Sequence, residues 1–347
     1  MGWLLLGMAI LLAAASYRWV ETPLRRAKQS ASAPSRRWVF TGATAACVVL
    51  AGAAFSTRIQ GGWHTRFPPD VVALDEARHP LIPFKECDGR APDFRSDACR
   101  IGVKGMPPRL LLWGDSHALA WAPAMDEILR RKGTSGILAI HSACPPLPGV
   151  NNPVSLGCHK FNRTVSDWLA RHRMADVYVV ASWLSYSEPA GQYSLFDDTG
   201  NEGNMEVFPP ALGRAISALR PVADSITLIW PTPGAPDDIP FRLAMAHYLD
   251  RPVPESKSAK QFRRRAEWFW REARRHQNSP QVILVDPASW FCDVDKCRYS
   301  AAADGRLLYR DGGHLSLSGS QFVADRFMSD DSSSRNGPLT PTADGAR

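Results

Sequence analysis

The pattern of apolar and polar positions divides the chain into a membrane-like N-terminal part and a longer globular part. From Arg109 onward, short apolar runs bounded by turn residues alternate with longer segments in which apolar residues recur at helical spacing. We predict strands at 110–113, 136–140, 177–181, 225–230 and 281–285, and helices at 118–131, 161–172, 211–219, 258–276 and 318–328. This alternation is typical of an α/β fold in which a central parallel sheet carries helices on both faces.

Two apolar runs precede the globular part. Gly2 to Tyr17 is uncharged but slightly short for a membrane span, whereas Trp38 to Ser56 is about long enough to cross a bilayer. Basic residues concentrate in the connector between them, from Arg18 to Arg37, which the positive-inside rule places in the cytoplasm. We therefore predict two transmembrane helices and an extracytoplasmic location for everything after Arg58. The alternative for Trp38 to Ser56 is a buried helix of a soluble protein.

Composition shifts along the chain indicate where its parts begin and end. Residues 59–108 carry many Pro, Gly and charged residues with little periodicity, and residues 329–347 are polar and rich in Ser, Asp and Gly. We therefore predict a membrane segment over 1–58, an extracytoplasmic linker over 59–108, a catalytic domain over 109–328 and a disordered tail over 329–347.

The net charge of +7 is local rather than general. Much of it lies in the connector at 18–37 and in the segment 257–275, and the motifs of nucleic-acid-binding modules are absent, so we predict no nucleic-acid partner. The basic, aromatic helix is either a solvated surface helix or a contact for an anionic glycan or lipid headgroups. The histidines are scattered and no two have ligand spacing, so we predict no metal site.

Six of the seven cysteines fall into near neighbours along the chain. No pair has the spacing of a zinc knuckle or of a thioredoxin-type redox motif. We predict three disulfides and an oxidising compartment, the alternative being six free thiols in a cytosolic enzyme. The expected pairs are Cys87–Cys99, Cys144–Cys158 and Cys292–Cys297.

The candidate nucleophile is Ser116, at the end of the predicted strand 110–113. Its turn, Gly114-Asp115-Ser116-His117, lies between a buried strand and a helix, so the serine is placed at the carboxyl edge of the sheet, where open α/β folds put their sites. Free backbone N–H groups at the helix start suit an oxyanion. Taken alone, the turn is equally compatible with a serine that merely caps the following helix.

A second segment favours the nucleophile. Asp311 and His314 stand three residues apart across two glycines, so the loop can fold back and bring the carboxylate to the imidazole. His314 can then take the proton of the Ser116 hydroxyl while Asp311 holds the histidine in the required tautomer. We predict a catalytic triad of Ser116, His314 and Asp311.

These blocks resemble the SGNH hydrolase family, and in particular the SGNH domain fused to the C-terminus of acyltransferase family 3 membrane proteins. The resemblance rests on 114–117, on Cys144-Pro145-Pro146-Leu147 and on the run from Cys292 to Gly319, and the segment 16–25 is similar to the end of that membrane domain. It implies an SGNH/flavodoxin-like three-layer sandwich and O-acylation, most often O-acetylation, of a cell-surface polysaccharide such as lipopolysaccharide O-antigen. It also implies a domain outside the inner membrane, no directly bound cofactor, and an acyl group that comes ultimately from acetyl-CoA through an acyltransferase family 3 domain. The expected partners are the membrane, a glycan acceptor and that domain, of which this sequence carries only the last part.

The chain departs from the SGNH pattern at the oxyanion hole. The block that carries an Asn in the family corresponds here to Val179-Val180-Ala181-Ser182-Trp183, which has none. The candidates for binding the oxyanion or the substrate are the backbone N–H of Ser116, Gly114, Asn162 and Trp183. Two other functions stay open: a carbohydrate esterase that uses the same triad, and a non-catalytic, membrane-anchored glycan-binding subunit.

Overall fold

The structure of the protein is a computed structural model that describes residues 2–22, 36–59, 62, 66–78, 80–93, 97–155, 157–188, 193–301 and 305–334. The chain divides into two compact units, Met1–Phe67 and Pro68–Arg347. Most of the predicted basic connector and the last part of the predicted tail, residues 23–35 and 335–347, lie outside the described residues.

The first unit contains two apolar helices. They are α1 (Gly2–Ser16), which continues as the π-helical turn η1 (Tyr17–Glu21), and α3 (Arg36–Ile59). The stretch Phe40–Ile59 is long and apolar enough to cross a membrane, with a mean hydropathy of 1.5, whereas the apolar stretch in the first helix, Leu6–Trp19, is shorter. Of the two transmembrane helices expected, one therefore reaches membrane-spanning length and composition within the described residues.

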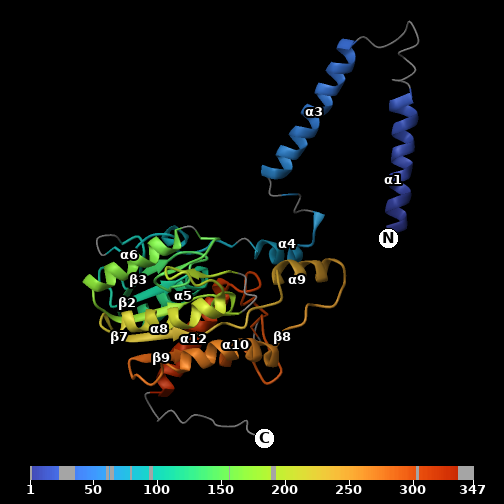
Figure 1. The fold of residues 1–347 in the computed structure, drawn as a ribbon. Coiled ribbons are helices and arrows are strands. Elements are labelled where there is room, and N and C mark those ends of the chain that lie inside the picture. The colour runs from blue at the N-terminus through green and yellow to red at the C-terminus, as the bar shows by residue number, and fades with distance from the viewer. Residues whose placement is uncertain are drawn as a thin grey trace. The chain divides into compact units, whose positions relative to one another are not determined.

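The second unit is built around a six-stranded sheet (Figure 1). The strands follow the order β1-β3-β2-β5-β7-β9; β1 pairs antiparallel with β3, and all the other pairs are parallel. The parallel strands thus follow the chain order 2-1-3-4-5 of the flavodoxin-like fold, with its switch point between β2 and β5. The sheet strands are β1 (Arg100–Gly102), β2 (Leu110–Gly114), β3 (Ser135–Ile140), β5 (Met174–Val180), β7 (Ala223–Ile229) and β9 (Val282–Val285).

Helices connect these strands, and short strand pairs decorate the loops. The helices are α4 (Pro69–Glu76), η3 (Lys85–Cys87), α5 (Ser116–Arg131), α6 (Cys158–Arg171), α7 (Trp183–Ser187), α8 (Asn204–Leu219), α9 (Ile239–Tyr248), α10 (Ala259–Arg274), α11 (Ala288–Phe291) and α12 (Leu317–Ser334). The short strands are β4 (Val150–Asn151), which pairs with β6 (Phe196–Asp197), and β8 (Lys257–Ser258), which pairs with β10 (Lys296–Cys297).

Strand β2 shows why the sheet needs helices on both faces. All five of its residues are buried, and successive side chains point to opposite sides. Leu110 and Leu112 join a core with α5 and α12, while Leu111 and Trp113 join a core with α6, α8 and α10. The result is the predicted three-layer α/β architecture.

Three expected boundaries are wrong. The range 59–108, expected to be a linker, contributes α4, which packs against α9, and strand β1, which extends the sheet beside β3. Helix α8 starts at Asn204 rather than at 211, because buried Val207 and Phe208 hold its first turns against the sheet despite Pro209 and Pro210. Residues 329–334, assigned to a disordered tail, form the last part of α12.

The three predicted disulfides are confirmed. Cys87 is bonded to Cys99, Cys144 to Cys158 and Cys292 to Cys297, whereas Cys47 in α3 is a free, exposed thiol. Each bond fastens a loop that surrounds the carboxyl edge of the sheet or its flanking strands, so the bonds stiffen segments that have little regular structure of their own.

Candidate active site

Ser116 lies at the point where β2 ends and α5 begins. Asp115 is the N-cap of α5: its backbone is extended, and its Oδ1 accepts a 2.8 Å hydrogen bond from the N–H of His117. Ser116 therefore occupies the first position of the helix, where a backbone N–H has no acceptor within the helix. Since β2 and β5 flank the switch point of the sheet, the serine stands where open α/β folds bind ligands.

The predicted triad residues are brought together. His314 Nε2 lies 2.8 Å from Ser116 Oγ, and His314 Nδ1 lies 2.7 Å from Asp311 Oδ2. The loop that carries both residues is folded back on itself, because Asp311 Oδ1 accepts hydrogen bonds from the N–H groups of Gly313 at 2.8 Å and His314 at 2.7 Å. The two intervening glycines thus allow the close turn that the Asp-Gly-Gly-His spacing predicts.

The charge on Asp311 determines the tautomer of His314. Burial alone raises the pKa of Asp311, but the hydrogen bond and charge of His314, with the N–H groups of His314 and Gly313, lower it far below its usual range. An ionised carboxylate only accepts hydrogen bonds, so Nδ1 carries the proton. Nε2 is then free to accept the proton of the Ser116 hydroxyl, as a general base must.

A second buried carboxylate joins the nucleophile turn to the neighbouring strand. Besides the N–H of His117, Asp115 accepts hydrogen bonds at Oδ2 from the N–H of Ser182 at 2.9 Å and from the hydroxyl of Tyr186 at 2.8 Å. Burial raises the pKa of Asp115, and these three donors oppose the rise. Asp115 therefore holds the start of α5 and the loop after β5 at a fixed separation.

His117 packs against His314. The two rings are 4.7 Å apart between centroids and inclined at 40°. Burial, and then the positive charge that His314 can carry, lower the pKa of His117 to about 3. His117 is consequently neutral at neutral pH.

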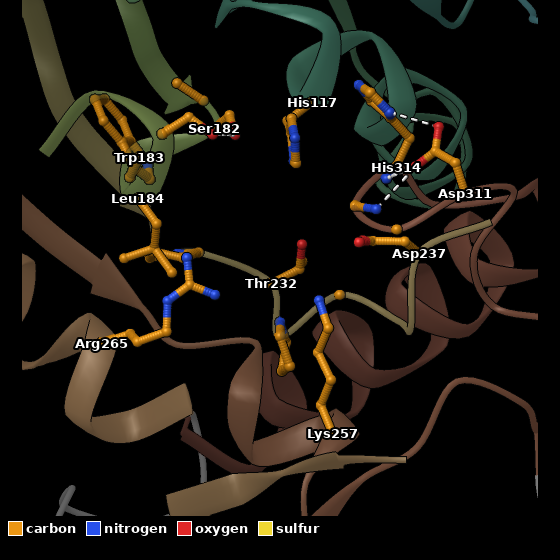
Figure 2. A pocket seen from close by; sticks show the side chains of 17 residues that line it. His117, Ser182, Trp183, Leu184, Thr232, Asp237, Lys257, Arg265, Asp311 and His314 are labelled. Carbon is orange, nitrogen blue, oxygen red and sulfur yellow. Dashed lines mark hydrogen bonds and ion pairs between the residues drawn. The ribbon is translucent and has the colours of Figure 1, made fainter. Parts of the chain in front are cut away.

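Two of the three predicted triad residues, Asp311 and His314, line a pocket of about 380 Å³ (Figure 2). Asp311, Gly312, Gly313, His314 and His117 form one wall, and the loop after β5 forms another. The remaining walls come from the segment after β7, from β8 and from α10. Their residues are Pro231, Thr232, Pro233, Gly234, Asp237, Lys257 and Arg265. Among the described residues, no group of three or more His, Cys, Asp or Glu side chains could hold a metal ion.

Of the three residues suggested besides Ser116 for the oxyanion or substrate, two do not line this pocket. Asn162 is buried in α6 and donates from Nδ2 to the carbonyls of Pro145 at 2.8 Å and Leu147 at 3.3 Å, so its amide satisfies the loop closed by Cys144–Cys158. Only glycine fits at position 114, because a Cβ there would lie 1.7 Å from the carbonyl oxygen of Val180. Each of the two residues therefore has a packing role outside the lining of this pocket.

Trp183, the third suggestion, does line the pocket. Its indole N–H, however, donates to the carbonyl of Ile229 at 2.7 Å, and its ring stacks on Phe269. It is a rigid part of the wall rather than a free donor.

Sequence reasoning missed Ser182, which follows the strand next to the one that ends at Ser116. Gly114 and Val180 are partners in the parallel β2–β5 pairing, so Ser116 and Ser182 each lie two residues beyond the same level of adjacent strands. The alignment of the two strand ends was the available signal. The family pattern, which has an Asn in this block, gives no indication of a serine there.

The comparisons with known proteins agree with this geometry. Residues 86–329, more than half of the chain, match the family described as SGNH domain (fused to AT3 domains). The chain belongs to this family. The resemblance drawn from the Gly-Asp-Ser and Asp-x-x-His blocks is thereby confirmed, and membership in the SGNH family supports an acyl-transfer or ester-hydrolysis activity. No curated protein sequence matches the chain.

Solved structures resemble this SGNH domain at low sequence identity. The periplasmic domain of a lipopolysaccharide acetyltransferase from Salmonella ser. Paratyphi A is 14% identical, with a TM-score of 0.48 and coverage of 65% of this chain and 84% of that one. A protein from Streptococcus pneumonia, provisionally described as a platelet activating factor, is 12% identical, with a TM-score of 0.34 and coverage of 80% of this chain and 98% of that one.

Proposed function

We propose that the protein is a serine-dependent O-acyltransferase that moves an acyl group to a hydroxyl of a cell-surface polysaccharide such as O-antigen. The acyl group that we propose is acetyl. The observation that carries the proposal is the unbroken hydrogen-bonded chain from Ser116 Oγ through His314 to Asp311, at the edge of an open pocket. Membership in a family of domains fused to AT3 domains supports acyl transfer over other serine chemistry.

In the first half of the reaction, Ser116 Oγ attacks the carbonyl carbon of the acyl donor while His314 Nε2 takes the hydroxyl proton. The bond to the leaving group then breaks, and His314 returns the proton to the leaving group. Asp311 stabilises the imidazolium formed in between. In the second half, a sugar hydroxyl attacks the acyl-enzyme, His314 accepts its proton, and that proton passes to Ser116 Oγ as the ester is released.

The oxyanion of each half-reaction needs donors that await it. We assign the first to the backbone N–H of Ser116 at the start of α5, and the second to the hydroxyl of Ser182. The N–H groups of His117 and Ser182 are both engaged by Asp115, and so are not available. The Ser182 hydroxyl has Ser185 Oγ at 2.7 Å as its described contact, and Ser182 lines the pocket together with His314.

The surroundings of the domain follow from the same proposal. The apolar stretch Phe40–Ile59 anchors the SGNH domain in the inner membrane, with the pocket on the periplasmic side. An acyltransferase family 3 domain, in the same or a separate polypeptide, supplies the acyl group from acetyl-CoA. The three disulfides support an oxidising location.

The test is hydrolysis of p-nitrophenyl acetate by the full chain, purified in detergent under oxidising conditions. We expect turnover that Ser116→Ala lowers by at least about 10³-fold, because the covalent route is lost. The control is Ser289→Ala, a serine outside the pocket whose hydroxyl bonds to the carbonyl of Asp286. Absence of serine-dependent turnover in a folded sample contradicts an enzyme and favours the glycan-binding subunit.

Product analysis with a sugar present separates transfer from hydrolysis. If the protein is a transferase, acetylated sugar appears at the expense of free acetate as the sugar concentration rises. If acetate alone forms at every sugar concentration, the protein is an esterase with the same triad, since water rather than the sugar reaches the acyl-enzyme.

A further inference from the structure

The side of the pocket that faces the triad carries two cations that the triad chemistry does not use. Lys257 lies in β8 and Arg265 in α10, and Figure 2 shows both side chains extending toward the pocket, Lys257 in the direction of Thr232 and Asp237. Lys257 is held on a rigid element, because it pairs in register with Cys297, and that cysteine is bonded to Cys292.

The ammonium of Lys257 lies close to the loop of the triad. A Cβ added at Gly234 would stand 3.2 Å from Lys257 Nζ and 2.5 Å from the carbonyl oxygen of Gly312. That same carbonyl accepts a 3.0 Å hydrogen bond from the N–H of Ala235. Lys257 Nζ and the carbonyl oxygen of Gly312, the residue after Asp311, therefore lie on either side of Gly234 and close to each other.

The two cations differ in how their charge is matched. Arg265 makes a pair of 2.8 Å hydrogen bonds with the carboxylate of Glu188. The ammonium of Lys257, in contrast, makes no hydrogen bond or ion pair with another residue in the described part of the chain. Its three donors are therefore available to a ligand.

Asp237 is the acidic group that faces Lys257. It is exposed, and its Oδ1 lies 2.7 Å from where a Cβ of Gly312 would be. Burial lowers the pKa of Lys257, and the charge of Asp237 opposes this without making an ion pair with it. A half-buried ammonium that has no ion-pair partner among the described residues is costly unless a ligand supplies the opposite charge.

The surface beside these residues is also basic. Residues 257–275 contain eight Lys or Arg and two Glu. Lys260, Arg263, Arg264 and Arg271 are exposed on α10, so the potential at the pocket mouth favours anions before they reach Lys257.

We propose that the pocket receives an acyl acceptor bearing a negative charge, a carboxylate or phosphate group on the sugar, which Lys257 binds and Arg265 supports. Binding this group next to the Asp311–His314 loop orients a neighbouring hydroxyl of the acceptor toward the acyl group on Ser116. The inference rests on the proposed function, because it names the class of acceptor for that reaction.

The experiment measures binding rather than turnover. The full chain carrying Ser116→Ala, in detergent, is titrated by calorimetry with glucose, glucuronic acid and glucose 6-phosphate. We expect at least one of the two acids to bind about tenfold more tightly than glucose, as one charge-assisted hydrogen bond provides. The two acids distinguish a carboxylate site from a phosphate site, and a preference for either supports the proposal.

Variants locate the preference. Lys257→Gln in the same background should remove most of the roughly tenfold advantage of the preferred acid, and Lys257→Arg should retain it. The matched control is Lys260→Gln, which removes an exposed cation three residues away that does not line the pocket. Circular dichroism confirms that each variant is folded.

Two results would overturn the proposal. One is equal affinity for glucose and both acids; the other is a preference that survives Lys257→Gln, which would assign it to the outer face of α10. Neither result bears on Ser116-dependent turnover of p-nitrophenyl acetate, so the failure of this inference and the failure of the proposed function are separate observations.

Discussion

The two sides of the pocket are built on opposite principles. On the triad side, the carboxylate oxygens of Asp311 and Asp115 accept hydrogen bonds from the surrounding N–H and O–H groups. These bonds leave Ser116, His314 and the loop after β5 little freedom to move. On the facing side, Lys257 is held in a paired strand, but its ammonium has no hydrogen-bond or ion-pair partner among the residues that the structure describes. The difference indicates a site whose reaction geometry is set before substrate arrives, while its selectivity is completed only by the ligand.

The sharpest way to break the triad side is Asp311→Asn. The amide can donate to His314 Nδ1 and so favour the tautomer whose Nε2 carries a proton and cannot accept one from Ser116. We expect kcat for p-nitrophenyl acetate to fall by about 10⁴-fold, as for a triad aspartate elsewhere. Asp325→Asn, an exposed carboxylate on α12, is the control. A loss of less than about tenfold would mean that Asp311 does not set the tautomer.

Removing the proposed oxyanion donor should have the next largest effect. Ser182→Ala is expected to lower kcat by about 10²- to 10³-fold with little change in KM, because the donor acts in the transition state. Ser185→Ala, which removes the hydroxyl that contacts Ser182, distinguishes loss of the donor from loss of its neighbour. Steady-state kinetics at several ester concentrations give the two constants, and an unchanged kcat in Ser182→Ala would place the second donor elsewhere.

Asp115→Asn tests whether the fixed separation of the two strand ends matters. An amide group cannot accept from all three donors, so one buried N–H or O–H loses its partner, at a cost of about 1–3 kcal/mol in the free energy of unfolding. We expect kcat to fall by about tenfold, since loss of one of these hydrogen bonds shifts Ser116 and Ser182 relative to each other. Tyr186→Phe removes one donor without adding another and should be milder in both measurements; a harsher effect would contradict this account.

The smallest expected effect concerns pH. Below about pH 6.5 the unfolded chain protonates His117, whereas in the native state its pKa is about 3, so stability falls as the pH is lowered between these values. The protonation of His117 can contribute at most about 1.4 kcal/mol per pH unit to the slope of the free energy of unfolding against pH. Urea unfolding at several pH values should therefore show a shallower acid decline for His117→Gln than for the wild type. Parallel curves would indicate that His117 takes up a proton in the native state.

Local patterns in the sequence were sufficient for part of the fold and of the site. The apolar run of β2, the Gly-Asp-Ser turn and the Asp311-to-His314 spacing each act over a few residues, and the structure places them as expected. The cysteines could be paired for the same reason, because each bond closes a short loop.

Features that depend on distant contacts could not be predicted. Asn is a polar residue typical of the exposed face of a helix, but Asn162 is buried because its Nδ2 donates to the carbonyls of Pro145 and Leu147. Lys257 and Arg265 belong to a basic segment that by pattern alone is a solvated face, and only the folding of β8 and α10 over the sheet edge brings them to the triad. Strand β1 is three residues long, too short for any periodicity.

The connectivity of the disulfides bears on how the domain is made. Each bond joins cysteines that are consecutive in the chain from Cys87 onward, with 12, 14 and 5 residues of separation. A polypeptide that emerges N-terminus first can therefore oxidise each pair before the next cysteine appears, and it reaches one connectivity among the many that six cysteines allow. Biogenesis then requires an oxidant but no reshuffling of mispaired bonds.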